Sequence, residues 1–124
     1  MSWTVDVGYV RDWLLALDER TYDQVLSALK LLEIHGPQLG RPCADTISGS
    51  SIKNLKELRP GSAGDSEIRI LFVFDPRRHA VMLVGGNKKG GWKRWYQKNI
   101  KQAERVYKTH LNQLKGAAEH GNDA

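Results

Sequence analysis

The chain has 124 residues, 40% of them hydrophobic and 27% charged, which is an ordinary composition for one globular domain with a modest core. Its single cysteine, Cys43, excludes an internal disulfide and a multi-cysteine metal site within one chain. No apolar run approaches ~18 residues and the N-terminus does not resemble a secretion signal, so we expect a cytoplasmic protein without a membrane span.

The formal net charge of +5 is concentrated in the second half of the chain. Between Lys53 and Lys108 there are 14 Lys or Arg against 5 Asp or Glu, whereas the rest of the chain holds 5 against 9. Affinity for nucleic acids comes largely from neutralising phosphates, so this asymmetry favours nucleic-acid binding. The alternative is a solvated surface that happens to be basic.

The first half of the chain predicts a short strand followed by two helices. Trp3–Val7 alternates apolar and polar residues, which indicates a strand. Tyr9–Leu17 has apolar residues at helical spacing, and Asp18 can cap a second helix whose apolar stripe runs over Tyr22–Leu32. The glycine–proline pair at positions 36 and 37 ends this helix.

The middle of the chain predicts two connections around a strand. Gln38–Ser51 is rich in Gly, Pro and Ser and reads as a loop, and its cysteine lacks an activating neighbour, so we do not expect a nucleophile there. Ile52–Arg59 predicts a strand at a partly exposed position of a sheet. Pro60–Ser66 is a glycine-rich connection to the next strand.

The centre of the sheet is predicted in the two strands that follow. In Glu67–Phe74 the even positions 68 to 74 are apolar and share one face, whereas Arg69 shares the other face with positions 71 and 73. Asp75 and Pro76 form a turn. Ala80–Val84 is apolar at every position, which indicates a strand covered on both faces.

A long helix is predicted after Gly91. Its buried stripe is Tyr96, Ile100, Ala103, Tyr107, Leu111 and Leu114. Cations with the same period lie on roughly the opposite side, namely Arg94, Lys98, Lys101, Arg105 and Lys108. We expect a single domain over residues 1–114 and a disordered tail over 115–124. The order β-α-α-β-β-β-α predicts an α+β fold, with a small, mainly antiparallel sheet packed against helices.

Four segments resemble one known family: LKELRP, EIRILFVFD, AVMLVGGNKKG and WKRWY. An ELR strand precedes an arginine early in the next strand, and paired lysines follow the third strand. In this arrangement the chain resembles the HigB-like branch of the RelE/ParE toxin superfamily, over about Leu14 to Leu114. The resemblance implies a RelE/ParE-like fold and a toxin of a type II toxin–antitoxin module.

Members of this superfamily differ in what they attack. HigB-like and RelE-like toxins cleave mRNA, usually on the ribosome and without a metal ion or cofactor, and a helix-turn-helix antitoxin (HigA-like) neutralises them. ParE-like toxins share the fold but inhibit DNA gyrase, so fold alone does not decide the function. Three hypotheses stay open: a ribosome-associated mRNA endoribonuclease that inhibits translation, a gyrase inhibitor, and a degenerate toxin that only binds an antitoxin.

The resemblance also assigns site residues. Arg59 matches the arginine that ends the ELR strand, and Arg69 matches the arginine that contacts the scissile phosphate in the RNA-cleaving members. Lys88 and Lys89 match the basic pair after the last strand. An alternative for Arg69 is a structural ion pair with a neighbouring glutamate, Glu57 or Glu67.

The chain departs from the family pattern at two places. The RelE-type pattern has lysines two and four positions before the first arginine, where this chain has Glu57 and Leu55. Lys53 and Lys56 lie close by, and they substitute only if they share the arginine's face of the sheet. Many HigB-like relatives also have a proline shortly after the lysine pair, where this chain has Gly-Gly-Trp.

The chemistry of RNA cleavage suits these residue types. RNA can be cut without a metal ion because the ribose 2′-OH is a nucleophile beside the phosphate. Arginines stabilise the extra charge on the phosphorane, so we predict that Arg59 and Arg69 bind the phosphate. A partly desolvated lysine can exchange protons near neutrality, which makes Lys89, with Lys88 as second choice, the candidate for proton transfer.

Further residues are candidates for RNA binding or only for solubility. An exposed Trp92 can stack on an unpaired base, which contributes ~1–3 kcal/mol, whereas Trp95 is expected in the buried stripe. The four histidines, at positions 35, 79, 110 and 120, are interpreted as surface residues. The predicted RNA-binding set is Lys53, Lys56, Trp92, Lys93, Arg94, Lys98 and Lys101.

Overall fold

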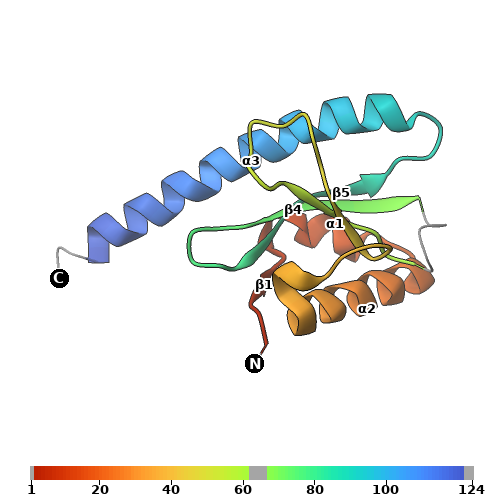
Figure 1. The fold of residues 1–124 in the computed structure, drawn as a ribbon, viewed down its shortest axis with the longest axis horizontal. Helices are drawn as coiled ribbons and strands as arrows, with labels where there is room; N and C mark the ends of the chain where they lie inside the picture. The colour runs from red at the N-terminus through yellow and green to blue at the C-terminus, as the bar shows by residue number, and fades with distance from the viewer. Residues whose placement is uncertain (1, 62–66, 122–124) are drawn as a thin grey trace.

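The computed structural model describes residues 2–61 and 67–121. Within these ranges a five-stranded sheet has the order β1-β5-β4-β3-β2 (Figure 1). The first strand is parallel to its neighbour β5, and the other pairs are antiparallel. The strands are β1 (Val5–Asp6), β2 (Ala44–Thr46), β3 (Lys56–Leu58), β4 (Ile68–Phe74) and β5 (Ala80–Asn87).

The helices lie on both faces of this sheet (Figure 1). A 3-10 turn η1 (Gly8–Val10) leads into α1 (Arg11–Leu15), which is followed by α2 (Glu19–His35) and the 3-10 turn η2 (Gly36–Gln38). The long helix α3 (Trp92–Gly121) crosses the opposite face. None of the helices in the described parts of the chain combines the length and apolar character needed to cross a bilayer.

Local sequence explains where α2 begins and ends. Asp18 has extended backbone, and its carboxylate accepts a hydrogen bond from the Thr21 N–H at 2.7 Å, as predicted for an N-cap. Gly36 ends the helix with a positive φ of 57°, and a Cβ at this position would lie 2.4 Å from the Trp3 ring. Glycine is therefore required both for the turn and for the close approach of the N-terminal segment.

The alternating strand pattern divides the core into two layers, as predicted. Ile70 and Phe72 of β4 pack with α1 and α2, whereas Leu71 and Val73 pack with α3. Strand β5 is likewise covered on both faces. The α+β class and the mainly antiparallel sheet are thus confirmed.

Two glycines bring helices close to β5 from opposite sides. A Cβ on Gly85 would lie 2.4 Å from the Trp13 ring of α1, and a Cβ on Gly86 would lie 2.7 Å from Trp95 Nε1 of α3. Real Cβ atoms essentially never come so near, so only glycine lets these indoles pack directly on the strand. The start of α3 is thereby fixed over the strand that pairs with β4.

Several predicted boundaries are wrong. The predicted loop 38–51 contains β2, a strand of three residues that is too short to show a period. Of the predicted strand 52–59 only Lys56–Leu58 pairs, because the preceding residues form turns, one with Asn54 at a positive φ of 64°. The first helix begins as a 3-10 turn at Gly8.

The predicted tail also needs correction. Helix α3 continues through residues 115–121, seven residues past the expected start of disorder. This segment lacks large apolar side chains and includes two glycines, but its Lys, Ala and Glu residues have high helix propensity, and it extends a helix that is already formed. Residues 122–124 of the predicted tail, like most of the predicted connection 60–66, lie outside the described residues.

Candidate active site

Two arginines and a carboxylate meet on the α3 face of the sheet. Glu57 of β3 lies opposite Leu71 in the ladder, so its side chain points to the α3 side. Arg59 is two residues further and shares this side, and Arg69 of β4 does so as well. Antiparallel pairing brings the end of β3 beside the start of β4, which is why residues ten positions apart come together.

The distances define a compact ion-pair cluster. Arg59 donates to Glu57 Oε1 from Nε at 2.9 Å and lies 2.8 Å from the same oxygen through Nη2. Arg69 Nε is 4.0 Å from that oxygen, and Arg69 Nη1 donates to the Ile68 carbonyl oxygen at 2.8 Å. The structure therefore brings together the two arginines predicted to bind phosphate.

Helix α3 contributes a phenol to this cluster. The Tyr96 hydroxyl donates to the second carboxylate oxygen, Glu57 Oε2, at 2.5 Å. Burial and the neighbouring Glu57 carboxylate raise the pKa of Tyr96 to about 12. The phenol thus keeps its proton at neutral pH and remains a donor. We refer to Glu57, Arg59, Arg69 and Tyr96 as the Glu57 cluster.

A second carboxylate extends the cluster toward the edge of the sheet. Asp45 of β2 lies 3.3 Å from Arg59 Nη2 and 2.9 Å from Arg41 Nε. The Thr46 N–H, followed by the Arg41 guanidinium, lowers the pKa of Asp45. Charges of opposite sign therefore alternate from Arg41 through Asp45, Arg59 and Glu57.

Access to solvent differs sharply within the Glu57 cluster. The side chains of Glu57 and Arg69 are 3% and 5% exposed, whereas that of Arg59 is 25% exposed. A ligand that arrives from solvent therefore meets Arg59 first. The ion pair between Arg69 and Glu57 is the structural alternative that the sequence left open, so this arginine has at least a structural role.

The predicted lysine pair lies beside the Glu57 cluster. Lys88 Nζ is 3.7 Å from Glu67 Oε2. Lys89 is exposed and lacks the desolvated surroundings that its predicted proton transfer requires. Gly86, which pairs with Arg69 in the β4–β5 ladder, lies under Trp95, so the exit of β5 adjoins the Glu57 cluster.

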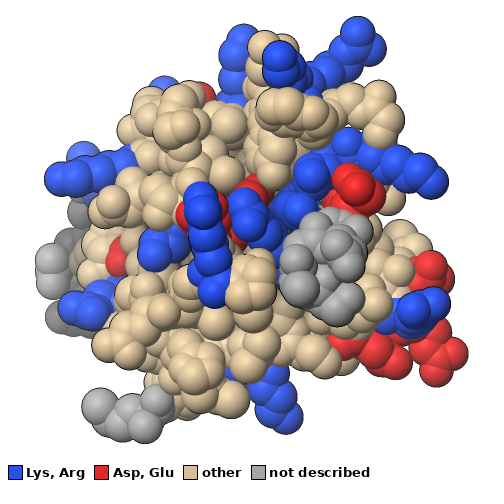
Figure 2. All heavy atoms as spheres, turned by 45° about the vertical axis from the view of Figure 1, so that its right-hand side comes forward, with Lys and Arg blue, Asp and Glu red and all other residues tan. Residues whose placement is uncertain are grey.

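Lys89 lines a cleft of about 390 Å³ with the first turns of α3. We call this the Lys89 cleft; its lining consists of Lys89, Gly90, Gly91, Arg94, Trp95, Lys98 and Asn99. Figure 2 shows Lys and Arg side chains spread over the face in view, with acidic side chains among them. Three predicted cations, Lys89, Arg94 and Lys98, are thus brought together.

The other predicted RNA-binding residues of α3 do not line this cleft. Trp92 is 56% exposed, with Lys93 Nζ 5.6 Å from its ring centroid. Lys101 lines a separate cleft with Tyr96 and Glu104. Trp95 is partly buried and packs against the α3 layer of the core, as expected.

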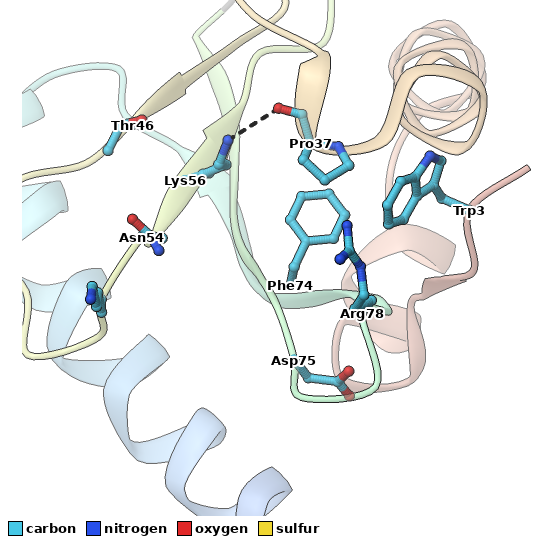
Figure 3. Close-up of a pocket in the computed structure, with 9 residues that line it drawn as sticks. Trp3, Pro37, Thr46, Asn54, Lys56, Phe74, Asp75 and Arg78 are labelled. Carbon is cyan, nitrogen blue, oxygen red and sulfur yellow. Dashed lines mark hydrogen bonds between the residues drawn. The ribbon is translucent and has the colours of Figure 1, made fainter.

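Lys53 and Lys56 do not join this face. Lys56 lies opposite Phe72, whose side chain packs with α1 and α2, so the lysine points away from the Glu57 cluster. Both lysines line another cleft, with Trp3 and Phe74 (Figure 3). They therefore do not substitute for the lysines that RelE-type toxins carry on this strand.

Sequence reasoning missed Glu57 and Tyr96 as members of the site. From the sequence, Glu57 is a departure from the family pattern and an ion-pair alternative for Arg69, and Tyr96 is only part of a buried stripe. The available signal was the Glu-Leu-Arg alternation, which places Glu57 and Arg59 on one face of β3. Nothing in the sequence gives the register that sets Arg69 beside them.

The surface interpretation of His110 is also wrong. This side chain is buried, and its polar atoms have partners: the buried Asp75 carboxylate accepts a hydrogen bond from it at 2.8 Å, and Tyr9 Oη lies 2.7 Å from the other ring nitrogen. The network joins α3 to the turn between β4 and β5. In the described parts of the chain no group of three or more His, Cys, Asp or Glu side chains is placed to hold a metal ion.

Comparison with known proteins gives the family. The profile of the family described as phage-derived protein Gp49-like matches residues 12–108. "Putative toxin HigB2" of Mycobacterium tuberculosis is 52% identical over 114 residues, which cover 92% of this chain and 57% of that protein. "Putative toxin HigB3" of the same organism is 48% identical over 112 residues, which cover 90% of this chain and 91% of that protein. The chain therefore belongs to the Gp49-like family and is a HigB-like relative of these two proteins.

Proposed function

We propose that the chain is the toxin of a type II toxin–antitoxin module and that it cleaves mRNA on translating ribosomes, by attack of a ribose 2′-OH on the adjacent phosphate. One observation carries the enzymatic part: two arginines and a phenol converge on one buried carboxylate, Glu57. The names of the two mycobacterial relatives support the toxin part.

The arginines supply charge stabilisation. Arg59 is partly exposed and has a planar fork of donors, so it binds a non-bridging oxygen of the scissile phosphate. Arg69 lies behind it, within 4.0 Å of the same carboxylate, and contributes a second fixed positive charge. Such preorganised charges act most strongly in the transition state, where the phosphorane carries extra negative charge.

Glu57 and Tyr96 are suited to proton transfer. A carboxylate within reach of the 2′-OH can accept its proton, and a phenol that is still protonated at neutral pH can donate to the leaving 5′-oxygen. The alternative proton carrier remains Lys89, with Lys88 as second choice, in the neighbouring cleft. If Glu57 and Tyr96 transfer the protons, Lys89 binds the RNA backbone instead.

The RNA chain would follow the Lys89 cleft. Arg94 and Lys98 lie along it and would bind successive phosphates, while the exposed Trp92 offers a face for an unpaired base. These contacts position the substrate, whereas the Glu57 cluster performs the reaction. A helix-turn-helix antitoxin whose acidic segment covers this basic face would block both.

A second candidate function has its own supporting observation. Because Arg69 is 5% exposed and paired with Glu57, the Glu57 cluster is also what a purely structural ion-pair network would look like. A degenerate toxin that only binds its antitoxin would need such a network for stability and would need no catalytic residues. The two candidates differ in whether Arg59 is required for RNA cleavage.

The test uses purified chain in a reconstituted translation system with a defined mRNA, read by primer extension. Wild type is compared with Arg59→Ala and with Arg41→Ala, a matched control that also contacts Asp45 but is 77% exposed and does not reach Glu57. We expect cleavage within the coding sequence, lowered about a hundredfold by Arg59→Ala only. Equal cleavage by all three proteins would reject the assigned site, and intact mRNA throughout would reject the nuclease.

A second assay with the same purified chain distinguishes inhibition of gyrase from RNA cleavage. Supercoiling of a relaxed plasmid by purified gyrase is measured with and without the wild-type chain. We expect no effect, because the proposed chemistry acts on a 2′-OH that DNA lacks. Inhibition of supercoiling together with intact mRNA would identify a ParE-like toxin instead.

A further inference from the structure

A second basic cleft lies on the other face of the sheet. Its volume is about 410 Å³, and it opens between the N-terminal segment, η2 and the turn after β4. We call it the Trp3 cleft; it is lined by Trp3, Pro37, Thr46, Lys53, Asn54, Lys56, Phe74, Asp75 and Arg78 (Figure 3). Phe74 belongs to the α1 and α2 layer of the core, so this cleft is separate from the Glu57 cluster.

One wall of the Trp3 cleft is aromatic. The rings of Trp3 and Phe74 meet edge to face, with their centroids 5.8 Å apart, and the Arg78 guanidinium lies 5.2 Å from the centroid of Trp3. Figure 3 shows these three side chains gathered beside Pro37. Aromatic faces and guanidinium planes are the surfaces on which unpaired bases stack.

The charges on the other surfaces are positive. Lys53, Lys56 and Arg78 contribute three cations, and the Lys56 ammonium uses one donor on the Pro37 carbonyl oxygen at 3.5 Å. Asp75 does not offset them, because its fully buried carboxylate is bound by Arg77 and His110. In Figure 3 that carboxylate points away from the aromatic wall.

Two residues that line the cleft have a backbone conformation that is unfavourable for side chains other than glycine. Among the described residues, the two non-glycine residues with positive φ are Asn54 (64°) and Arg78 (65°), and both line this cleft. Such conformations cost about 1–3 kcal/mol and cluster at ligand sites. Asp75 fixes the second of them, since it accepts from the backbone N–H groups of Arg77 and His79.

We propose that the Trp3 cleft binds one nucleotide of single-stranded RNA, outside the cleavage site. The base packs against Trp3, Phe74 and the Arg78 plane, and the flanking phosphates bind Lys56 and Lys53. The lining carries three cations, and two of its acceptors, the Pro37 carbonyl and the Asp75 carboxylate, are engaged, which suits phosphates better than the N–H groups of a peptide. The inference rests on the proposed function only in taking RNA as the ligand.

The test uses the four indole N–H groups as separate reporters. The full chain, labelled with ¹⁵N, is titrated with a 2′-O-methylated uridine hexamer, which binds but cannot be cleaved. Trp3 reports on the Trp3 cleft, Trp95 on the Lys89 cleft and Trp92 on the exposed start of α3, while Trp13 lies under Gly85 as an internal reference. We expect a saturable shift of the Trp3 signal that weakens as salt is raised.

Variants test whether the shift of the Trp3 signal arises from binding in the Trp3 cleft. Lys56→Gln and Arg78→Gly, the latter compatible with the positive φ, should each weaken the apparent affinity read at Trp3 by about fivefold and leave the Trp92 signal unchanged. Arg20→Ala, at the exposed start of α2, should change neither signal. All variants are first checked for the wild-type pattern of dispersed backbone signals.

The outcomes separate this inference from the proposed function. A Trp3 signal that stays fixed while Trp92 and Trp95 shift would overturn the second site and leave the nuclease intact. A Trp3 shift without cleavage in the translation assay would retain the site and reject the nuclease. If an acidic decapeptide, and not the hexamer, moves the Trp3 signal, the cleft binds a peptide and the RNA assignment is wrong.

Discussion

Glu57 lies at the centre of the candidate site, between two arginines and a phenol. Its two oxygens accept from Arg59 and Tyr96, and a second arginine lies within 4.0 Å, while its side chain is 3% exposed. A carboxylate buried this deeply is tolerated only because these donors compensate for the lost hydration. The residue is therefore important for stability as well as for the proposed chemistry.

Replacing Glu57 by Gln should lower the free energy of unfolding by about 3 kcal/mol, because Arg69 then stays buried beside a neutral amide. Urea denaturation measures this directly. Glu33→Gln, at an exposed position of α2, is the matched control and should change stability by less than about 0.5 kcal/mol. Equal stability of the two variants would show that Glu57 is not buried with its partners.

The phenol of Tyr96 provides a titration signal for the same contact. Its pKa of about 12 lies above the ordinary value of 10.0. The protonated phenol therefore stabilises the folded state fully below pH 10, and this contribution to the free energy of unfolding is lost as pH rises through 12. The Glu57→Gln variant should lower this pKa but keep it above 10, since burial contributes as well. NMR of labelled Tyr ring carbons measures it, and an unchanged pKa in the variant would contradict the contact.

At the scale of secondary-structure elements, the close approach of helices to β5 depends on two adjacent glycines. Gly85→Ala should destabilise the fold by about 1–3 kcal/mol, because the new Cβ collides with the Trp13 ring that anchors α1. Thermal or urea unfolding checks this value. Gly91→Ala is the control, since a Cβ there has nothing within 4 Å. A tolerated Gly85→Ala would mean that α1 does not pack directly on the strand.

The turn between β4 and β5 anchors α3 through Asp75. Burial alone raises the pKa of Asp75, but hydrogen bonds from His110, the His79 N–H and Arg77 outweigh it and the net pKa is lowered. A lowered pKa in the folded state means that this stabilisation is present above the ordinary value of 3.8 and is lost as pH falls below it.

Asp75→Asn should therefore be less stable than wild type at neutral pH and show a smaller loss of stability on acidification. The midpoint of thermal unfolding, measured from neutral pH down to about pH 3, tests both parts. Asp23→Asn, at an exposed position of α2, should follow the wild-type curve. Parallel curves for wild type and Asp75→Asn would contradict the role of the buried carboxylate.

Sequence pattern was sufficient for the elements with a clear period. The alternation in β4 predicts both core layers and the side of Arg69, and the helical stripe predicts the buried face of α3 as far as Tyr107, whereas the predicted burial of Leu111 is wrong because that residue lies beyond the sheet layer and is exposed. Strand β2 was not predictable, because three residues in a polar segment carry no period and pair only through their neighbour β3. Strand β3 was predicted too long because the mixed sequence before Lys56 does not reveal that these residues form turns.

At the scale of the whole molecule, the basic second half of the sequence does not form one surface. The sheet separates its cations, with Arg59 and Arg69 on the α3 side and Lys56 on the side of α1 and α2. Strand register decides this separation, and register depends on long-range pairing that a single sequence does not reveal. Two clefts of similar size lie on the two sides, one along which we propose that the RNA substrate lies and one for the further RNA contact.

The most direct test of the account is a map of RNA 5′ ends across the transcriptome after controlled expression. Wild type, Arg59→Ala and Arg41→Ala are compared at matched protein levels. We expect new 5′ ends inside coding sequences with wild type and Arg41→Ala, and about a hundredfold fewer with Arg59→Ala. Growth arrest by the wild type with no new 5′ ends, or the same ends with Arg59→Ala, would contradict the assignment of the Glu57 cluster as a cleavage site.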